Sequence, residues 1–281
     1  MKSASSLHLF DPLDVVTPGR IIRWYENIAL ELDAGFLSPE ERAYMRSYYA
    51  EVGLLRPWRR SFFLNHFAPA FAAAATYLLD GRHGRTFVDL GSGTGTQALA
   101  LALLGARVIA LDGDETAARI LRKRMRFYES VTARALNITV ATTSALEYDY
   151  SDCAPIAGIW SLFAFNLMQP SSMLLDHIIP HCSPQARVAI QDGNRLSWLG
   201  RLPGRRRSVW SPVELDRALC ARGFRRDRLR GAAALPPVAW LMLPEALLAT
   251  IEGALLGSWA FALSYLALYE REAPPSGMPG Q

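Results

Sequence analysis

The sequence predicts an α/β fold with a doubly wound, mostly parallel sheet, and three observations lead to this prediction. From residue 85 onward, short apolar runs rich in Val and Ile alternate with amphipathic helical segments. Strands separated by helices are typical of parallel sheets, and strands that are apolar throughout fit a sheet covered on both faces. The 281 residues, 51% of them hydrophobic, suffice for one large domain with a helical appendage.

Residues 1–80 are expected to form an N-terminal helical lid or cap. Apolar side chains recur there at helical spacing, at Ile21, Tyr25, Ile28 and Leu32. A second helix should begin at the stretch "SPEE", where Ser38 is the N-cap and Glu41 completes a capping box. A third helix is expected over residues 65–81, which end in a glycine.

Strands and helices should then alternate through the rest of the chain. The expected strands are 86–90, 107–112, 137–143, 156–162 and 186–192, and the expected helices are 96–105, 115–131, 171–180 and 211–224. The apolar run 253–269 has barely the length of a membrane span, and we interpret it as a buried helix followed by a buried strand. The Pro- and Gly-rich tail, residues 272–281, is expected to be disordered.

The charge and the cysteine content bear on which partners and which cellular location to expect. The net charge is +4, and arginines gather at 201–207 and 222–230. We interpret both clusters as solvated surface, the alternative being a site for an anionic substrate, a nucleic acid or a lipid head group. The three cysteines are far apart in the sequence and the N-terminus lacks an apolar signal core, which favours a reducing, cytoplasmic location.

A glycine-rich loop follows the first predicted strand. The strand ends at Asp89, and the loop runs from Gly91 to Gly95 before the next helix. Glycines let the backbone turn sharply and let a ligand approach closely, and ligands of such sheets bind beyond the carboxyl ends of the strands. Asp112 ends the second strand, 23 residues after Asp89, where a carboxylate can accept both hydroxyls of a ribose.

Two nucleotide classes compete for this loop. Residues 93–98 match the dinucleotide pattern G-x-G-x-x-A, but they begin four residues after Asp89, too late for a tight turn directly after the strand. Residues 89–95 match D-x-G-x-G-x-G at every fixed position. In that pattern the acid can pair with an ammonium group, whereas it would repel a pyrophosphate.

The stretches "VDLGSGTG" and "VIALDGDE" resemble the first motif and the ribose-binding strand end of class I S-adenosylmethionine-dependent methyltransferases. The resemblance implies S-adenosylmethionine as cofactor and a seven-stranded sheet over 81–271 whose last strand, "ALSYLALYE", is antiparallel. It also implies a set of cofactor contacts. Asp89, Gly91, Ser92, Gly93 and Gly95 would surround the methionine part, Asp112 would bind the ribose, and Gly113, Ser144, the Ala145 backbone N–H and Leu146 would border the adenine.

Candidate catalytic and substrate-binding residues lie at the ends of the fourth and fifth predicted strands, and one further candidate lies on the predicted lid. The aromatic face of Trp160 is placed to steady the sulfonium by cation–π attraction. Asn166 and Asp192 are candidate substrate contacts, and His66 is a candidate general base because its pKa is ordinarily near neutral. For Phe163, core packing is the favoured role. Core packing is also favoured for the lid tyrosines 25, 48 and 49, with an aromatic substrate pocket as their alternative.

The leading hypothesis is therefore a methyltransferase that acts on a small organic or lipid-like acceptor. Asn166 departs from the N-P-P-Y pattern of enzymes that methylate amino groups of nucleic acids and proteins, so no nucleic-acid partner is expected. The fourth strand ends without the acid used by metal-dependent enzymes of the catechol type, so no metal is expected. The alternatives are an NAD-dependent oxidoreductase and a non-catalytic cofactor-binding scaffold. Nothing in the sequence indicates an oligomeric state.

Overall fold

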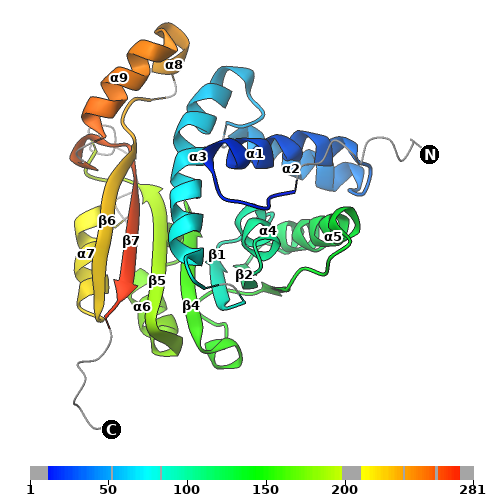
Figure 1. Ribbon diagram of the computed structural model, residues 1–281, viewed down its shortest axis with the longest axis vertical. Coiled ribbons are helices and arrows are strands. Elements are labelled where there is room, and N and C mark those ends of the chain that lie inside the picture. Colours follow the sequence, from blue (N-terminus) through cyan, green and yellow to red (C-terminus); the bar gives the residue numbers. More distant parts are fainter. Residues whose placement is uncertain are drawn as a thin grey trace.

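The computed structural model describes residues 12–51, 53–82, 84–197, 210–236, 238–256 and 259–272. Seven strands form one sheet with the order β3-β2-β1-β4-β5-β7-β6. The strands are β1 (Thr86–Leu90), β2 (Arg107–Asp112), β3 (Ile138–Thr142), β4 (Ile156–Leu162), β5 (Cys182–Gly193), β6 (Phe224–Ala233) and β7 (Ser264–Arg271). The first five strands are parallel to one another, and β7 runs antiparallel between β5 and β6 (Figure 1). The predicted doubly wound, seven-stranded sheet with an antiparallel last strand is confirmed.

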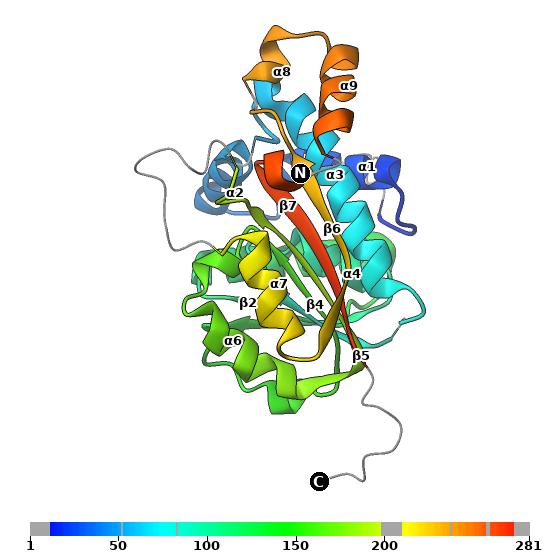
Figure 2. The same cartoon turned by 90° about the vertical axis from the view of Figure 1, so that its left-hand side faces the viewer.

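Helices cover both faces of this sheet. They are α1 (Pro18–Asp33), α2 (Pro39–Glu51), α3 (Pro57–Leu79), α4 (Thr96–Leu103), α5 (Glu115–Thr132), α6 (Ser171–Ile178), α7 (Pro212–Cys220), α8 (Ala239–Met242) and α9 (Glu245–Leu255). One hydrophobic cluster lies between the sheet and α1, α3, α4 and α5, and a second lies under α6 and α7. Figure 2 shows α8 and α9, which connect β6 to β7, projecting beyond one end of the sheet.

The predicted helix starts are present. At α2, the Ser38 backbone N–H donates to Glu41 over 2.8 Å, and the Glu41 N–H donates to the Ser38 hydroxyl over 3.3 Å. Ser211 and Glu214 form the same reciprocal capping box at α7. The third helix is longer than expected, because it begins at Pro57, an N-terminal position at which proline is favourable.

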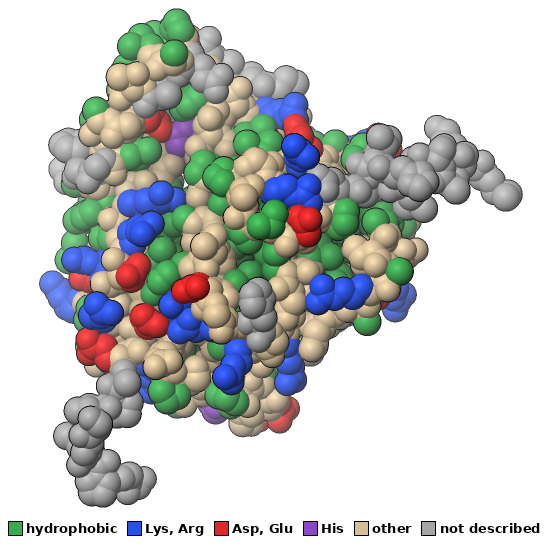
Figure 3. All heavy atoms as spheres, in the orientation of Figure 1, with side chains coloured by type: hydrophobic (Ala, Val, Ile, Leu, Met, Phe, Trp, Pro, Cys, Tyr) green, Lys and Arg blue, Asp and Glu red, His purple; other side chains and the backbone are tan. Residues whose placement is uncertain are grey.

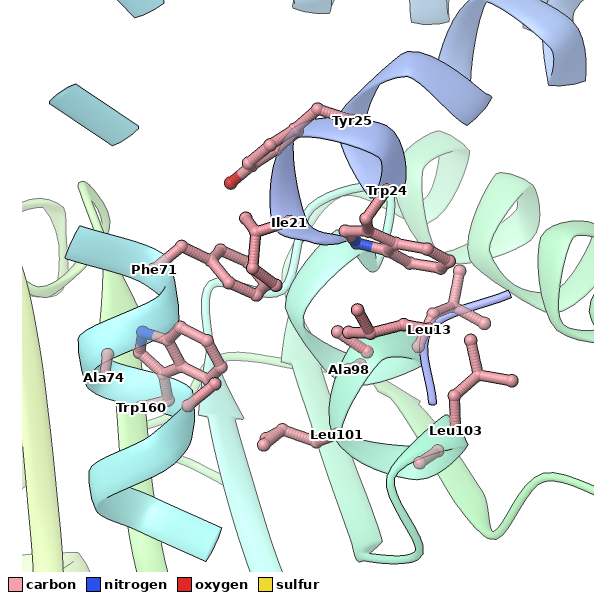
Figure 4. Close-up of a cluster of buried hydrophobic side chains, with 14 of the residues drawn as sticks. Leu13, Ile21, Trp24, Tyr25, Phe71, Ala74, Ala98, Leu101, Leu103 and Trp160 are labelled. Carbon is pink, nitrogen blue, oxygen red and sulfur yellow. The ribbon is translucent and has the colours of Figure 1, made fainter. Parts of the chain in front are cut away.

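The helices of the N-terminal segment do not all lie in one layer. Helix α3 packs directly on the sheet and contacts β4, β5, β6 and β7. Helix α1 packs across α3 and over α4, and Figure 4 shows Trp24 and Tyr25 of α1 pointing into the cluster that Phe71 of α3 and Trp160 of β4 complete. Residues 60–79 of α3 are long and apolar enough to span a membrane, but more than half of the most apolar part of this stretch is buried inside the protein.

The structure describes only one of the two arginine clusters. Residues 201–207 lie outside the described residues, as does most of the predicted tail. Residues 224–230 form most of β6, an edge strand that the arginine-rich sequence did not predict. Charged side chains on an edge strand discourage pairing with another chain. Lys and Arg side chains are interspersed with acidic ones over the face in Figure 3, so that face carries no patch of a single sign.

A buried ion pair joins the N-terminal helices to the sheet. Glu31 of α1 and Arg124 of α5 are both 0% exposed. The Arg124 guanidinium donates to the two Glu31 carboxylate oxygens over 2.5 and 2.9 Å, and also to the Thr94 carbonyl over 2.6 Å. Burial alone would lower the pKa of Arg124, but the Glu31 carboxylate raises it above the ordinary value, so Arg124 stays charged.

Breaking this pair should destabilise the protein severely. Glu31→Gln leaves the Arg124 charge buried without its counter-charge, which costs about 3–5 kcal/mol of unfolding free energy. Urea unfolding followed by circular dichroism measures the loss. The matched control is Glu26→Gln, because Glu26 pairs with Arg60 at the surface, where a pair contributes at most about 1 kcal/mol. Equal losses in the two variants would contradict this assignment.

Candidate functional site

The glycine loop lies between β1 and α4 and is held from both sides. The backbone N–H groups of Gly91 and Ser92 donate to the Leu111 carbonyl at the end of β2, each over 2.9 Å. Gly91 and Gly95 both have positive φ, and neither has room for a side chain. A Cβ at Gly91 would lie 2.2 Å from Ala164, and one at Gly95 would lie 2.0 Å from Leu121. Only glycine fits these two positions.

A cavity of about 720 Å³, which we call the loop cavity, opens over this loop at the carboxyl ends of β1, β2 and β3. Its size is in the range of small-molecule and cofactor sites. Seven of the residues expected to contact a cofactor line it: Gly91, Gly93, Asp112, Gly113, Ser144, Ala145 and Leu146. The structure therefore brings the glycine loop, the end of β2 and the segment after β3 to one cavity.

Asp112 lines the loop cavity, and two backbone groups orient its carboxylate. One oxygen accepts from the Gly93 N–H over 2.7 Å, and the other accepts from the Asp114 N–H over 2.8 Å. Each carboxylate oxygen has a second lone pair left for a ligand. A pair of neighbouring hydroxyls, as in a ribose, matches two oxygens presented in this way.

The loop cavity is acidic. Glu51, Asp112 and Asp114 line it, and no Lys, Arg or His among the described residues does. Such a lining favours a ligand with positive charge and repels a pyrophosphate. The charge of the cavity thus distinguishes between the two nucleotide classes that compete for the loop.

Four other expected contacts lie elsewhere. Gly95 is packed against Leu121, and Ser92 lines a second cavity. Trp160 is 1% exposed and lies in the core, with its ring 4.6 Å from that of Phe71, so it lines neither cavity. Asp89 is fully buried behind the loop.

Asp89 has an environment unusual for a carboxyl group. Both of its oxygens are buried, and neither accepts a hydrogen bond of ordinary geometry from the described residues, although the Ala98 backbone N–H lies close enough to lower the pKa slightly. Burial first, and the nearby Asp112 carboxylate second, raise the pKa of Asp89 to about 8. The Asp89 carboxyl therefore keeps its proton at neutral pH.

The second cavity, of about 290 Å³, lies between the loop and the N-terminal helices, and we call it the aromatic cavity. Aromatic rings dominate its wall, and the remaining lining is neutral: Tyr25, Tyr48, Tyr49, Phe63, Phe67 and Phe163, with Ser92, Thr94, Thr96, Gln97 and Leu162. Tyr48, Leu162 and Phe163 also line the loop cavity, so the two cavities share a wall.

Two aromatic side chains form most of this shared wall. The Tyr48 hydroxyl lies directly over Gly93, since a Cβ there would be 3.0 Å from it. Phe163 follows β4 with a φ of 56°, a left-handed conformation that is rare for a bulky residue. Its ring stacks on Phe67 with centroids 5.1 Å apart. Strained residues of this kind concentrate at functional sites.

The three predicted catalytic residues lie away from both cavities. His66 contacts Glu252 of α9 through Nε2 and the Phe62 carbonyl through Nδ1, and it is 4% exposed. Asn166 and Asp192 come together, because the Asn166 backbone N–H donates to the Asp192 carboxylate over 3.1 Å. Asn166 also accepts from the Trp210 N–H over 2.7 Å, so this pair ties together the segments that follow β4 and β5. No group of three or more metal-ligating side chains occurs within the described ranges.

Sequence reasoning missed several residues around these cavities. Tyr48 and Phe163 were expected in the core, yet both line the two cavities. Arg124 was not singled out, although it shares a helix face with Leu121 and Tyr128. A charged residue at apolar helical spacing is the signal that would have found it, because a buried charge requires a partner.

Replacing Asp89 with Asn should remove a pH dependence of stability. Between about pH 4 and 8 the unfolded chain loses the Asp89 proton while the folded protein keeps it, so the unfolding free energy falls as pH rises and levels off above pH 8. From pH 5.5 to 7.5 this loss is about 2–3 kcal/mol. Urea unfolding at both pH values should show the wild type losing that much more than Asp89→Asn. Equal losses of unfolding free energy in the wild type and in Asp89→Asn would show that the Asp89 carboxyl has its ordinary pKa in the folded protein.

Comparisons with known proteins agree on the fold. The plantazolicin methyltransferase BpumL in complex with S-adenosylhomocysteine (SAH) superposes with a TM-score of 0.52 at 15% identity, covering 90% of this chain and 98% of that one. The magnesium protoporphyrin IX methyltransferase ChlM from Synechocystis gives 0.51 at 15% identity, covering 84% and 99%. The [4+2]-cyclase SpnF gives 0.52 at 16% identity, covering 72% and 82%. No protein-family model and no curated protein sequence matches the chain. The chain has the fold of the class I S-adenosylmethionine-dependent methyltransferases.

Proposed function

We propose that this protein is a methyltransferase that uses S-adenosylmethionine and acts on a small organic or lipid-like acceptor. The observation that carries the proposal is the acidic loop cavity, in which Asp112 presents two oriented oxygens beside glycines that admit no side chain. S-adenosylmethionine carries a positive sulfonium, an ammonium group and a ribose, and these groups suit that lining.

In this proposal Asp112 binds the ribose hydroxyls. Gly113, Ser144, Ala145 and Leu146 border the adenine, and the glycine loop lies along the methionine part. Behind the loop, the Asp89 carboxyl supplies a counter-charge for the ammonium group. An ammonium nearby lowers the pKa of a carboxyl group, so it would favour the ionised form of Asp89.

The bound cofactor would supply an electrophilic methyl group on a positively charged sulfur, for in-line transfer to a nucleophilic acceptor whose proton would pass to water. The protein's tasks are to align the two reactants and to exclude bulk water. The aromatic cavity shares a wall with the loop cavity, and this position supports the alignment of the two reactants. His66 has no part in this proposal, because its ring is held by Glu252 and the Phe62 carbonyl.

The alternatives are less well supported. An oxidoreductase would have to place the pyrophosphate of a dinucleotide against Glu51, Asp112 and Asp114 without a cation from the described lining. A scaffold that binds anionic surfaces would gain from a patch of one charge sign, whereas acidic and basic side chains are interspersed over the face in Figure 3.

Calorimetric titration with SAH tests the cofactor. We expect micromolar binding of SAH and none of NADH by the wild type. Asp112→Ala should weaken SAH binding about tenfold to a hundredfold, since two charge-assisted hydrogen bonds are lost. The control is Glu115→Ala, an exposed acid three residues further along that lines neither cavity. Retained SAH affinity in Asp112→Ala, or NADH binding by the wild type, would sink the proposal.

A further inference from the structure

The lining of the aromatic cavity consists mainly of aromatic side chains. Six aromatic side chains and one leucine face a volume of about 290 Å³. The polar groups at its edge are the hydroxyls and the amide of Ser92, Thr94, Thr96 and Gln97. No charged side chain among the described residues lines it.

The absence of charge there restricts what can enter. A charged group loses its hydration on entering such a cavity and finds no opposite charge, a cost of several kcal/mol. A flat apolar ring keeps favourable stacked and edge-on contacts with the aromatic wall. The lining therefore selects neutral, planar molecules over carboxylates, phosphates and amines that are protonated at neutral pH.

The volume restricts the size of the occupant. A dry apolar cavity of about 150 Å³ takes one benzene ring. The aromatic cavity has about twice that volume, so it accommodates about two fused rings. A tetrapyrrole or a peptide of several residues exceeds this space.

The wall that the two cavities share indicates what the aromatic cavity could bind and why. Tyr48 and Phe163 face both cavities, so an occupant of the aromatic cavity is separated from a cofactor in the loop cavity by one layer of side chains. Tyr48 is 37% exposed, and its hydroxyl contacts the glycine loop at Gly93. A rotation of this side chain would join the two spaces.

Resting on the proposed function, we infer that the aromatic cavity is the acceptor site and that the acceptor is a neutral, planar aromatic molecule of about two rings with one hydroxyl group. The hydroxyl is inferred because no Asp, Glu, His, Lys or Arg side chain among the described residues lines the cavity to act as a base. The Tyr48 hydroxyl is protonated at neutral pH, so it can donate a hydrogen bond to the acceptor. An aryl hydroxyl is more acidic than an alkyl one, so its proton can pass to water as the bond to the methyl carbon forms, and the ionised molecule does not have to enter the uncharged cavity.

The test uses 2-naphthol as the probe and 6-hydroxy-2-naphthoate as its charged counterpart. Calorimetry at pH 7 in saturating SAH should show 2-naphthol binding at least tenfold more tightly than the naphthoate. Phe67→Leu removes a stacked ring from the cavity wall and should weaken 2-naphthol binding about tenfold with SAH affinity unchanged. Phe127→Leu is the matched control, because Phe127 is also partly buried and stacks on Phe36 with centroids 4.5 Å apart, but lies outside the cavity.

The outcomes separate this inference from the proposed function. SAH binding without 2-naphthol binding, or equal affinity for the naphthoate, overturns the acceptor class and leaves the cofactor assignment standing. Competition between 2-naphthol and SAH overturns the inference as well, because the cavity would then hold part of the cofactor. Failure of SAH itself to bind overturns the proposed function. Should Phe67→Leu not fold, Tyr48→Phe keeps the ring and is expected to weaken 2-naphthol binding by losing the hydrogen bond alone.

Discussion

The ion pair between Glu31 and Arg124 is the constraint on which the rest of the site depends. Two charges removed from water are costly unless every hydrogen bond is made, and here the guanidinium spans the Glu31 carboxylate and the Thr94 carbonyl. Tyr128 donates to the same carboxylate over 2.7 Å. One group thus fixes helix α1, helix α5 and the glycine loop relative to each other.

That constraint also sets the position of α2. The Tyr49 hydroxyl contacts the hydroxyls of Thr94 and Thr96 over 2.8 and 2.5 Å, so α2 is attached to the same loop. Tyr48, the adjacent residue, is thereby held over Gly93. The N-terminal helices are therefore part of the site and close one side of it.

The sequence predicted the sheet and the loop cavity better than the aromatic cavity. Glycines and acids at strand ends carry a local signal, and Gly91, Gly93 and Asp112, which were expected near the cofactor, all line the loop cavity. The role of Tyr48 depends on how α2 packs over a loop some 45 residues away, which helical spacing does not encode. At the end of β4, alternation of side chains turns Trp160 into the core and leaves Phe163, beyond the strand, at the cavities. Strand β6 escaped prediction because its arginines hide the alternation typical of strands.

The left-handed backbone conformation of Phe163 affects which substitutions at this position would stabilise the protein. A bulky residue at a φ of 56° costs on the order of 1 kcal/mol that glycine or asparagine would not. A glycine there would relax the backbone while deleting a ring from the wall that both cavities share. Selection for thermal stability alone would therefore favour replacing Phe163 and losing its ring from this wall. Stability and activity thus compete at this position.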